Sequence, residues 1–436
     1  MTFVFSGDEL TAEDLQGFID LHQAKVPRYL ALKKQYESKP PILDMEVKEA
    51  WKPDNRLVVN FGRKLIETFN GYFLGIPVKI SHDNETINEV IQNYWNHNDM
   101  DDTLSELGKL TDLYGVAYLY QYQNENSHTR VIYNSPLDMF IIYDDTIEEN
   151  PLFAVRYHYN KDNQLEGALI TENKYVSFTE VKDKLVFTDE SPHYYPTLPV
   201  IEFISNEEQQ SLIEPVETLI NAFNKTLSFK MNDADYFADA YLAVLGAELD
   251  EKGTYKIRDN RIINIFGTDD ASKIVVEFLN KPDGDTSQEH LLDRLEDLIY
   301  QISMIANIND ETFGTSSGVA LEFKLQPMKN LAASKERKFV RSLNRMFRNF
   351  FGLPTNVPNS TRNDWADIQY RFTRNIPRNV QDEAETASKL EGIVSKESQL
   401  SVLSIVDNPT KEMERMDKES LPTNLTDAEL STRFGR

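Results

Sequence analysis

The chain has 436 residues, with 46 lysine and arginine residues against 71 aspartate and glutamate residues, and a formal net charge of −25. This length predicts two or three domains rather than one core, and the 40% apolar content excludes a disordered chain. The acidic balance disfavours binding to free nucleic acid, and the absence of cysteine excludes disulfides, thiolate metal sites and a cysteine nucleophile.

The sequence predicts no targeting or membrane-spanning segment. The N-terminus lacks the basic start and the apolar run of a signal peptide, and no apolar run approaches the ~20 residues that cross a bilayer. We therefore expect a protein that is made in a cytoplasm and does not enter a membrane.

The first half of the chain changes its hydrophobic period near residue 116. Apolar residues at helical spacing predict helices within 8–37, 56–74, 85–95 and 101–114. From 116 to 204, short runs of valine, isoleucine, tyrosine and phenylalanine alternate with turn residues, which predicts an antiparallel β-meander.

Two long helices are expected next, with a small β-rich module between them. Capping boxes at Ser211 with Glu214 and at Thr286 with Glu289 predict their starts. Apolar residues at helical spacing predict one buried face on each: Leu212, Val216, Leu219, Phe223, Leu227, Met231 and Ala234 on the first, and Leu291, Leu295, Leu298, Ile302 and Ile305 on the second. Strand-forming residues dominate 240–283, so the pair resembles a stalk with a β module at its end.

A glycine- and serine-rich loop then precedes a long helix with a basic face. Glycines tolerate turn conformations closed to other residues, and a serine before an apolar run is a good helix cap; the residues concerned are Gly314, Ser316, Ser317 and Gly318. One face should be buried through Phe339, Leu343, Met346, Phe347 and Phe350. Another face carries Lys338, Arg341, Arg345 and Arg348. Residues 322–348 hold eight basic and two acidic side chains, a net of +6 on an acidic chain.

The sequence offers no catalytic signature. It contains no P-loop, no H-E-x-x-H and no G-x-S-x-G, and its seven histidines are scattered. Carboxylates cluster at 99–102, 144–149 and 283–285, but each cluster lies in a turn or at a helix start, where aspartate is favoured for local reasons. We predict no catalytic residue, no metal site and no cofactor.

Several segments, taken in order, resemble the portal proteins of tailed bacteriophages, in the branch found in long-tailed phages of Gram-positive bacteria. The segments are NRLVVNFGRKLIETFNGYFLGIPV (55–78), LTDLYGVAYLYQY (110–122), SPLDMFIIYDD (135–145), ETFGTSSGVALEFKLQPMKNLAASKERKF (311–339) and the acidic helical region 376–420. None is diagnostic alone, but together they cover most of the chain.

The resemblance implies an α+β portal fold with a mixed wing, a two-helix stem, a small β-rich clip, a long kinked helix and a helical crown. The expected parts are the wing at 1–205, stem helices at 206–239 and 284–305, the clip at 240–283, a tunnel loop at 306–318, the long wing helix and a strand at 319–379, and the crown at 380–436. The clip matches in position and size rather than in residues.

The resemblance also implies the function. Portal proteins form a ring of twelve subunits at one capsid vertex, through which double-stranded DNA enters during packaging and leaves during ejection. The expected partners are further copies of the chain, the DNA, terminase, a head-tail connector protein, and the major capsid and scaffolding proteins, and the expected location is the virion.

Two features of this chain acquire expected roles from that resemblance. The tunnel loop should meet DNA through Asn307, Asn309, Asp310 and Glu311, which avoid strong phosphate affinity, with its glycines as hinges. The basic helix has two open interpretations: its cations could face DNA, or could pair with carboxylates of a neighbouring subunit. We favour the second slightly, because the chain supplies so many carboxylates.

Two other functions stay open at the level of sequence. A metal-dependent nucleic-acid enzyme would need carboxylates or histidines that converge from separate elements. A structural adaptor would assemble without contacting DNA.

Overall fold

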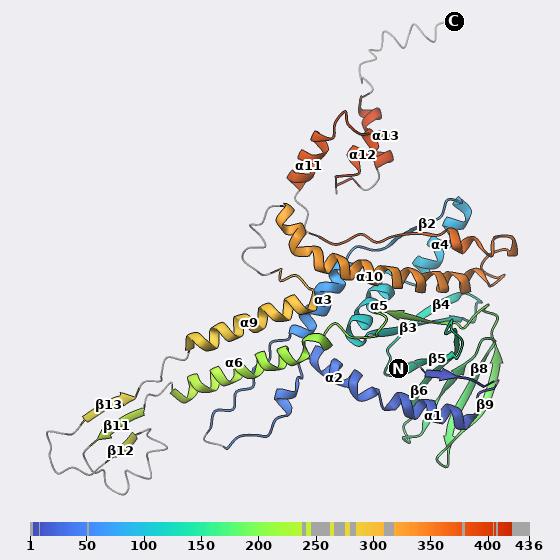
Figure 1. Cartoon of the computed structure of the whole chain (residues 1–436). Helices are drawn as coiled ribbons and strands as arrows, with labels where there is room; N and C mark the ends of the chain where they lie inside the picture. Colours follow the sequence, from blue (N-terminus) through green and yellow to red (C-terminus); the bar gives the residue numbers. More distant parts are fainter. Residues whose placement is uncertain are drawn as a thin grey trace. The chain divides into compact units, whose positions relative to one another are not determined.

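The structure is a computed structural model, and the residues that it describes are 3–7, 9–49, 52–237, 241–245, 262–265, 275–279, 285–308, 318–376, 380–403, 405–406 and 409–420 (Figure 1). The chain divides into two compact units, Met1–Arg374 and Asn375–Arg436. The mixture of helices and sheets confirms the predicted α+β class. Among the helices in these ranges, none combines the length and the hydropathy that crossing a bilayer requires.

The helices predicted before residue 116 are present. They are α1 (Ala12–Gln23), α2 (Val26–Tyr36), α3 (Phe61–Leu74), α4 (Glu85–His97) and α5 (Met100–Tyr114). The region 8–37 holds two helices because the chain turns at Ala24 and Lys25, and α3 begins at Phe61, where the Asn60 side chain caps the N–H of Arg63. Gly115 ends α5 at φ +88°, and a Cβ there would lie 2.0 Å from the carbonyl oxygen of Gln209. Only glycine fits that turn.

The β region forms two sheets rather than the single meander predicted for 116–204. The larger sheet has the order β1-β5-β6-β7-β8-β9, and the smaller has the order β10-β3-β4. The larger contains β1 (Phe3–Phe5), β5 (Met139–Asp144), β6 (Pro151–Tyr159), β7 (Leu165–Ile170), β8 (Lys174–Val181) and β9 (Lys184–Pro192); the smaller contains β3 (Val116–Gln123), β4 (Thr129–Asn134) and β10 (Val200–Ile204). The meander prediction is correct for β5 to β9. It is wrong for β10, which returns to pair with β3.

Two hydrophobic clusters explain why the strands separate into two sheets. On one face of the larger sheet, Leu15 and Ile19 of α1 pack against Phe140, Val155 and other buried apolar residues. On the opposite face, Ile141 of β5 packs with Val116 and Val200 of the smaller sheet. Both faces of the central strands are therefore buried, and burial of this apolar surface stabilises the arrangement.

Two long helices, α6 (Glu217–Phe237) and α9 (Asp285–Ser303), pack against each other (Figure 1). The first begins later than the predicted Ser211, after the 3₁₀ turn η2 (Glu214–Val216). Glu214 accepts a hydrogen bond from the Ser211 N–H at 2.6 Å, but the Ser211 hydroxyl accepts from Ile213 rather than from Glu214, so only half of the predicted capping box forms. In the second predicted box, Glu289 forms an ion pair with Lys230 of α6.

The predicted buried faces of these helices are wrong in part. Met231 of α6 and Leu291 and Ile302 of α9 are exposed, whereas Leu292, Leu295 and Ile299 are buried. On α6 the buried positions at i, i+4 and i+8 are polar: Asn224, Ser228 and Asn232. An extended segment before α3, residues 55–59, covers them. We call this segment the strap.

Three side chains of α6 hold the strap by accepting hydrogen bonds from its backbone N–H groups. The N–H groups of Asn55, Leu57 and Val59 donate to Asn232 Oδ1 at 2.6 Å, Ser228 Oγ at 2.9 Å and Asn224 Oδ1 at 2.8 Å. Four residues of an α-helix rise about 6 Å, close to the advance of two residues in an extended strand. The spacing of every fourth residue on α6 therefore matches the spacing of every second residue in the strap. Because the three α6 residues are polar, a search for apolar periodicity does not identify their face as buried.

The segment of the chain between α6 and α9 contains three strands, which form a small sheet. They are β11 (Tyr241–Leu245), β12 (Ile262–Ile265) and β13 (Val275–Leu279), in the order β12-β11-β13. The middle strand is parallel to β12 and antiparallel to β13. This segment was predicted to be rich in strands.

The last helix of the first unit is α10 (Gly318–Phe351), which contains Pro327. The chain then returns through the 3₁₀ turns η4 (Asn359–Thr361) and η5 (Asp364–Asp367) to β14 (Gln369–Arg371), which pairs with β2 (Lys79–Ser81). Another 3₁₀ turn, η1 (Pro41–Asp44), precedes the strap. The second unit contains α11 (Val380–Lys389), α12 (Lys396–Leu400) and α13 (Pro409–Ser420), in agreement with the predicted helical tail.

Replacing Ser228 with alanine tests the strap. The change removes the acceptor of the Leu57 N–H in a part-buried hydrogen bond, so we expect the free energy of unfolding to fall by about 1 kcal/mol in urea titrations. Ser334→Ala, at a partly exposed position in α10, is the matched control and should change it by less than about 0.5 kcal/mol. Equal effects of the two variants would contradict this account of the strap.

Candidate functional site: the basic helix and its carboxylates

The apolar face of α10 anchors it to the body of the first unit. Phe339, Leu343, Met346, Phe347 and Phe350 are all buried, as predicted. The helix contacts β10 of the smaller sheet and the turn η5. Near its start, Pro327 lacks the N–H that an α-helix would use, and the first turns run at an angle to the rest (Figure 1).

Lys335 occupies a core position of that face rather than the surface. It lies four residues before Phe339, and its side chain and that of Asp112 in α5 are each 1% exposed. Lys335 Nζ is 2.7 Å from Asp112 Oδ1 and donates to the carbonyl oxygen of Gly108 at 3.0 Å. The rings of Phe69, Phe73 and Phe339 surround the ammonium group, with centroids at 5.1–5.3 Å. The result is a buried ion pair inside an aromatic shell.

Asp112 joins α5 and α10 to the chain that leads into α6. Its carboxylate accepts from the Ser205 hydroxyl at 3.0 Å, and its carbonyl oxygen accepts from the Ser211 hydroxyl at 3.0 Å and the Leu212 N–H at 2.9 Å. Burial raises the pKa of Asp112 and lowers the pKa of Lys335, and attraction between the two charges opposes both shifts. Removing one partner would therefore leave an uncompensated buried charge.

The four predicted residues of the basic face have different surroundings. Lys338 forms an ion pair with Glu207, just after β10. Burial lowers the pKa of Arg345, as do the positive charges of Arg341 and Arg348, whereas Tyr143 and Glu202 raise it. Arg341 and Arg348 are exposed.

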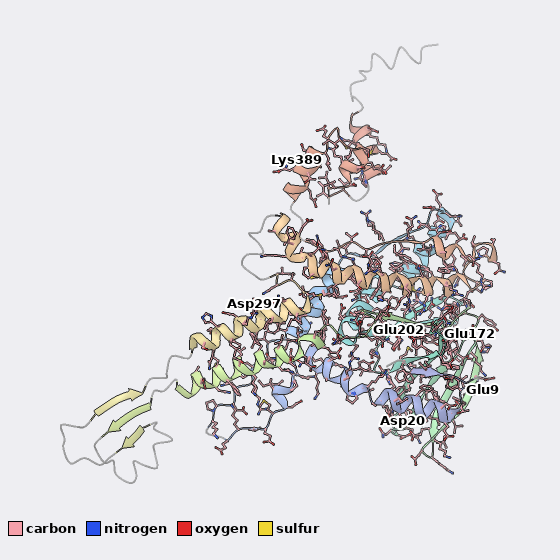
Figure 2. All side chains as sticks on the ribbon, viewed as in Figure 1. Glu9, Asp20, Glu172, Glu202, Asp297 and Lys389 are labelled. Atoms are coloured by element: carbon pink, nitrogen blue, oxygen red, sulfur yellow. The ribbon has the colours of Figure 1, made fainter. Side chains whose placement is uncertain are left out.

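Glu202 of β10 lies among these charges, within the body of the first unit (Figure 2). Burial raises the pKa of its carboxyl group, while the nearby Tyr143 hydroxyl, the charges of Arg345 and Arg341, and a hydrogen bond from Gln209 Nε2 at 2.9 Å oppose that shift. Carboxylates of the same chain thus face part of the basic helix. The sequence analysis considered only DNA or carboxylates of a neighbouring subunit as partners of this helix, and not carboxylates of the same chain.

Most of the predicted tunnel loop lies outside the described residues. This holds for Asn309, Asp310, Glu311, Gly314, Ser316 and Ser317. Asn307, after the end of α9, donates through Nδ2 to Glu296 Oε1 at 3.3 Å, and Gly318 is the first residue of α10.

The first two carboxylate clusters have local partners. Asp101 accepts from the Trp95 indole at 2.7 Å, and Asp144 accepts from Thr146 and Asn150 at 2.7–3.2 Å. The Thr146 hydroxyl is the main cause that lowers the pKa of Asp144. Within the part of the chain that the structure describes, no three His, Cys, Asp or Glu side chains gather in a way that could hold a metal ion.

Sequence reasoning counted Lys335 only as one of eight cations, and it did not single out Asp112. A signal for Lys335 was present, because residues 328, 332, 335 and 339 continue the helical spacing of the buried stripe. Asp112 lies in the same way among the buried residues of α5. A charge at a core position of one helix predicts an opposite charge on a facing helix, although it does not say which one.

Comparison with known proteins places the chain in a family. The family model described as phage portal protein, SPP1 Gp6-like, matches residues 16–421. The chain belongs to this portal protein family. The match confirms the resemblance seen in the sequence, and the family is one of structural proteins.

Two similar relatives are named as portal proteins. The portal protein of Bacillus phage SPP1 is 25% identical over 395 residues, which cover 84% of this chain and 76% of the relative. That of Clostridium phage phiCD119 is 21% identical over 419 residues, covering 88% and 90%. A solved structure named as the neck of an empty GTA particle, computed with C6 symmetry, covers 86% of this chain and 93% of its own, at 11% identity and a TM-score of 0.47.

Substitutions of Lys335 and Asp112 test how much their buried ion pair contributes to stability. Lys335→Met should lower the free energy of unfolding by about 3–5 kcal/mol, because Asp112 would stay buried without its counter-charge. The double variant Lys335→Met/Asp112→Asn should recover most of that loss, since neither buried charge remains. Chemical denaturation followed by circular dichroism measures both.

Lys338→Met is the matched control, because its partner Glu207 is largely exposed, and it should cost about 1 kcal/mol or less. A double variant no more stable than Lys335→Met would contradict the role given to the unpaired carboxylate.

Proposed function

We propose that this protein forms a ring-shaped channel for DNA at one vertex of a phage capsid. The ring would admit the genome during packaging, join the head to the tail, and release DNA during ejection. The observation that carries the proposal is the portal family match over residues 16–421, which spans nearly the whole chain. As a portal protein the chain would be a component of the virion.

The parts of a portal can be assigned to this chain by the same proposal. The wing would comprise 1–205 and 319–379, the stem 206–239 and 284–305, the clip 240–283, the tunnel loop 306–318 and the crown 380–436. The packing of α6 against α9 and the three-stranded sheet between them in sequence support the stem and the clip.

The expected partners follow from these parts. Twelve copies of the chain would surround double-stranded DNA, and the clip would contact terminase during packaging and a head-tail connector protein afterwards. The major capsid and scaffolding proteins would contact the outside of the ring. A β module between two long helices supports this role of the clip, because insertions between helices often protrude and carry binding surfaces.

The charge of the chain fits the passage of DNA. Each lysine or arginine that pairs with a phosphate releases counterions and adds affinity, so a cationic channel would hold the duplex and slow it. A subunit with a formal charge of −25 would present a mostly repulsive wall. Sliding would then meet little resistance.

We further propose that the exposed Arg341 and Arg348 contact a neighbouring subunit rather than DNA. Lys335 and Lys338 already have carboxylate partners within the chain. The guanidinium groups of Arg341 and Arg348 would pair with carboxylates on the adjacent copy. Such contacts would help to close the ring through a heterologous interface.

Assembly of the purified chain tests the main proposal. We expect light scattering to give the mass of a closed homo-oligomer, and negative-stain electron microscopy to show rings with an axial hole wide enough for a DNA duplex. A monomer that stays stable at high concentration and low salt would contradict the proposal. A metal-dependent cleavage assay on the same sample checks the enzyme alternative, and we expect no cleavage.

A separate variant tests the tunnel loop. Asn309→Lys with Asp310→Lys should leave ring assembly intact but slow or stall DNA packaging, because the new cations would pair with phosphates. The defect should weaken as salt rises. Asn363→Lys with Asp367→Lys, at exposed positions at the two ends of η5, is the matched control and should package normally. Normal packaging by the loop variant at low salt would show that the loop does not meet DNA.

A further inference from the structure

A pocket of about 570 Å³ lies between the two sheets of the first unit. Its walls come from β3, β4, β6, β8, the end of β9 with the segment that follows it, and Leu353 after α10. Five tyrosines line it: Tyr120, Tyr122, Tyr175, Tyr194 and Tyr195. The volume falls within the range of pockets that hold ligands, and the aromatic faces suit an apolar or aromatic group.

His193 supplies a buried hydrogen-bond acceptor to this pocket. Its side chain lies between Tyr175 and Tyr195, with ring centroids at 4.8 and 5.7 Å, and the residue is only 8% exposed. Its Nε2–H donates to the Thr171 carbonyl oxygen at 2.9 Å, so Nδ1 carries the lone pair. Nδ1 is buried and has no hydrogen-bond partner among the described residues. An acceptor in that state favours a ligand that brings a donor.

Burial lowers the pKa of His193, which keeps the ring neutral and Nδ1 available as an acceptor. The ring has little freedom to turn away, because Thr171 holds its other nitrogen.

Arg156 supplies a cation at the same pocket. Its Nε–H donates to Asn134 Oδ1 at 3.2 Å, and none of the ion pairs within the described ranges includes it. The nearby carboxylate of Glu166 lies 2.9 Å from His158 Nε2 instead. The terminal nitrogens of Arg156 can therefore receive a carboxylate from a ligand.

We propose that this pocket binds a tyrosine side chain that lies next to a carboxylate, presented by a partner protein. The aromatic ring would lie against the five tyrosines, the phenolic O–H would donate to His193 Nδ1, and the carboxylate would pair with Arg156. Phenylalanine would leave the buried acceptor without a donor, and a lysine or arginine would be repelled by Arg156. The chemistry of the pocket does not depend on the portal function.

Three small molecules separate these contributions. N-acetyl-L-tyrosine carries the ring, the hydroxyl and the carboxylate; N-acetyl-L-phenylalanine lacks the hydroxyl, and N-acetyl-L-tyrosinamide lacks the charge. We expect saturation-transfer NMR on the purified full chain to give a millimolar Kd for N-acetyl-L-tyrosine. Binding of each of the other two should be about tenfold weaker. Equal binding of all three, or no binding, would overturn the proposal.

Variants connect the binding to the named residues. Arg156→Gln should abolish the difference between N-acetyl-L-tyrosine and its amide, and His193→Phe should abolish the preference for the hydroxyl. Arg362→Gln, at an exposed position after α10, is the control and should change neither. If His193→Phe does not fold, Arg156→Gln decides alone: an unchanged preference for the carboxylate would overturn the proposal.

The same measurement on assembled rings tests the kind of occupant. A pocket reserved for a partner protein should bind N-acetyl-L-tyrosine as well in the ring as in the free chain. Binding to the free chain and not to the ring would mean that a second copy covers the pocket, and would overturn a partner protein as the occupant.

Discussion

The ion pair between Lys335 and Asp112 is the contact on which the arrangement of α5, α10 and the chain before α6 depends. Two charges that are each 1% exposed carry a large cost of removal from water, which only a close partner and further hydrogen bonds can offset. Asp112 Oδ1 meets this condition through Lys335 and the Ser205 hydroxyl, whereas Oδ2 has no hydrogen-bond partner among the described residues. The carbonyl oxygen of Asp112 also accepts hydrogen bonds from Ser211 and Leu212, before α6. Lys335 contacts both the Asp112 carboxylate and the Gly108 carbonyl oxygen, which connects this turn of α10 to the last turns of α5.

The strap supplies a second constraint of the same kind. Asn224, Ser228 and Asn232 bury polar groups on α6 because each accepts a backbone N–H from an extended segment. A helix that receives backbone hydrogen bonds in this way can bind a strand without a sheet. Helix α6 is thereby connected to the N-terminal part of the first unit, in addition to its packing against α9. In both places, paired polar groups act together with apolar packing to connect neighbouring elements.

The fold could be predicted from the sequence wherever the residues of a single element, or of two consecutive strands, are enough to define the hydrophobic periodicity. The buried stripe of α10 and the hairpins from β5 to β9 follow from their own periodicity. Prediction failed where the partner is distant in the chain: β10 pairs with β3, β1 joins β5, and the polar face of α6 is buried by the strap. The candidate site shows the same division. The positive charge of α10 is visible in the sequence, but the carboxylates that receive Lys335 and Lys338 lie in segments more than a hundred residues away.

Lys335 and Lys338 of α10 have carboxylate partners within their own subunit, which leaves the exposed Arg341 and Arg348 available for contacts between subunits. A high-resolution electron cryomicroscopy structure of the assembled oligomer tests this central claim most directly. We expect Lys335 to contact Asp112, and Lys338 to contact Glu207, of the same chain in every subunit. A Lys338 side chain that pairs with a neighbouring subunit or points into an axial channel, or a Lys335 separated from Asp112, would contradict the claim.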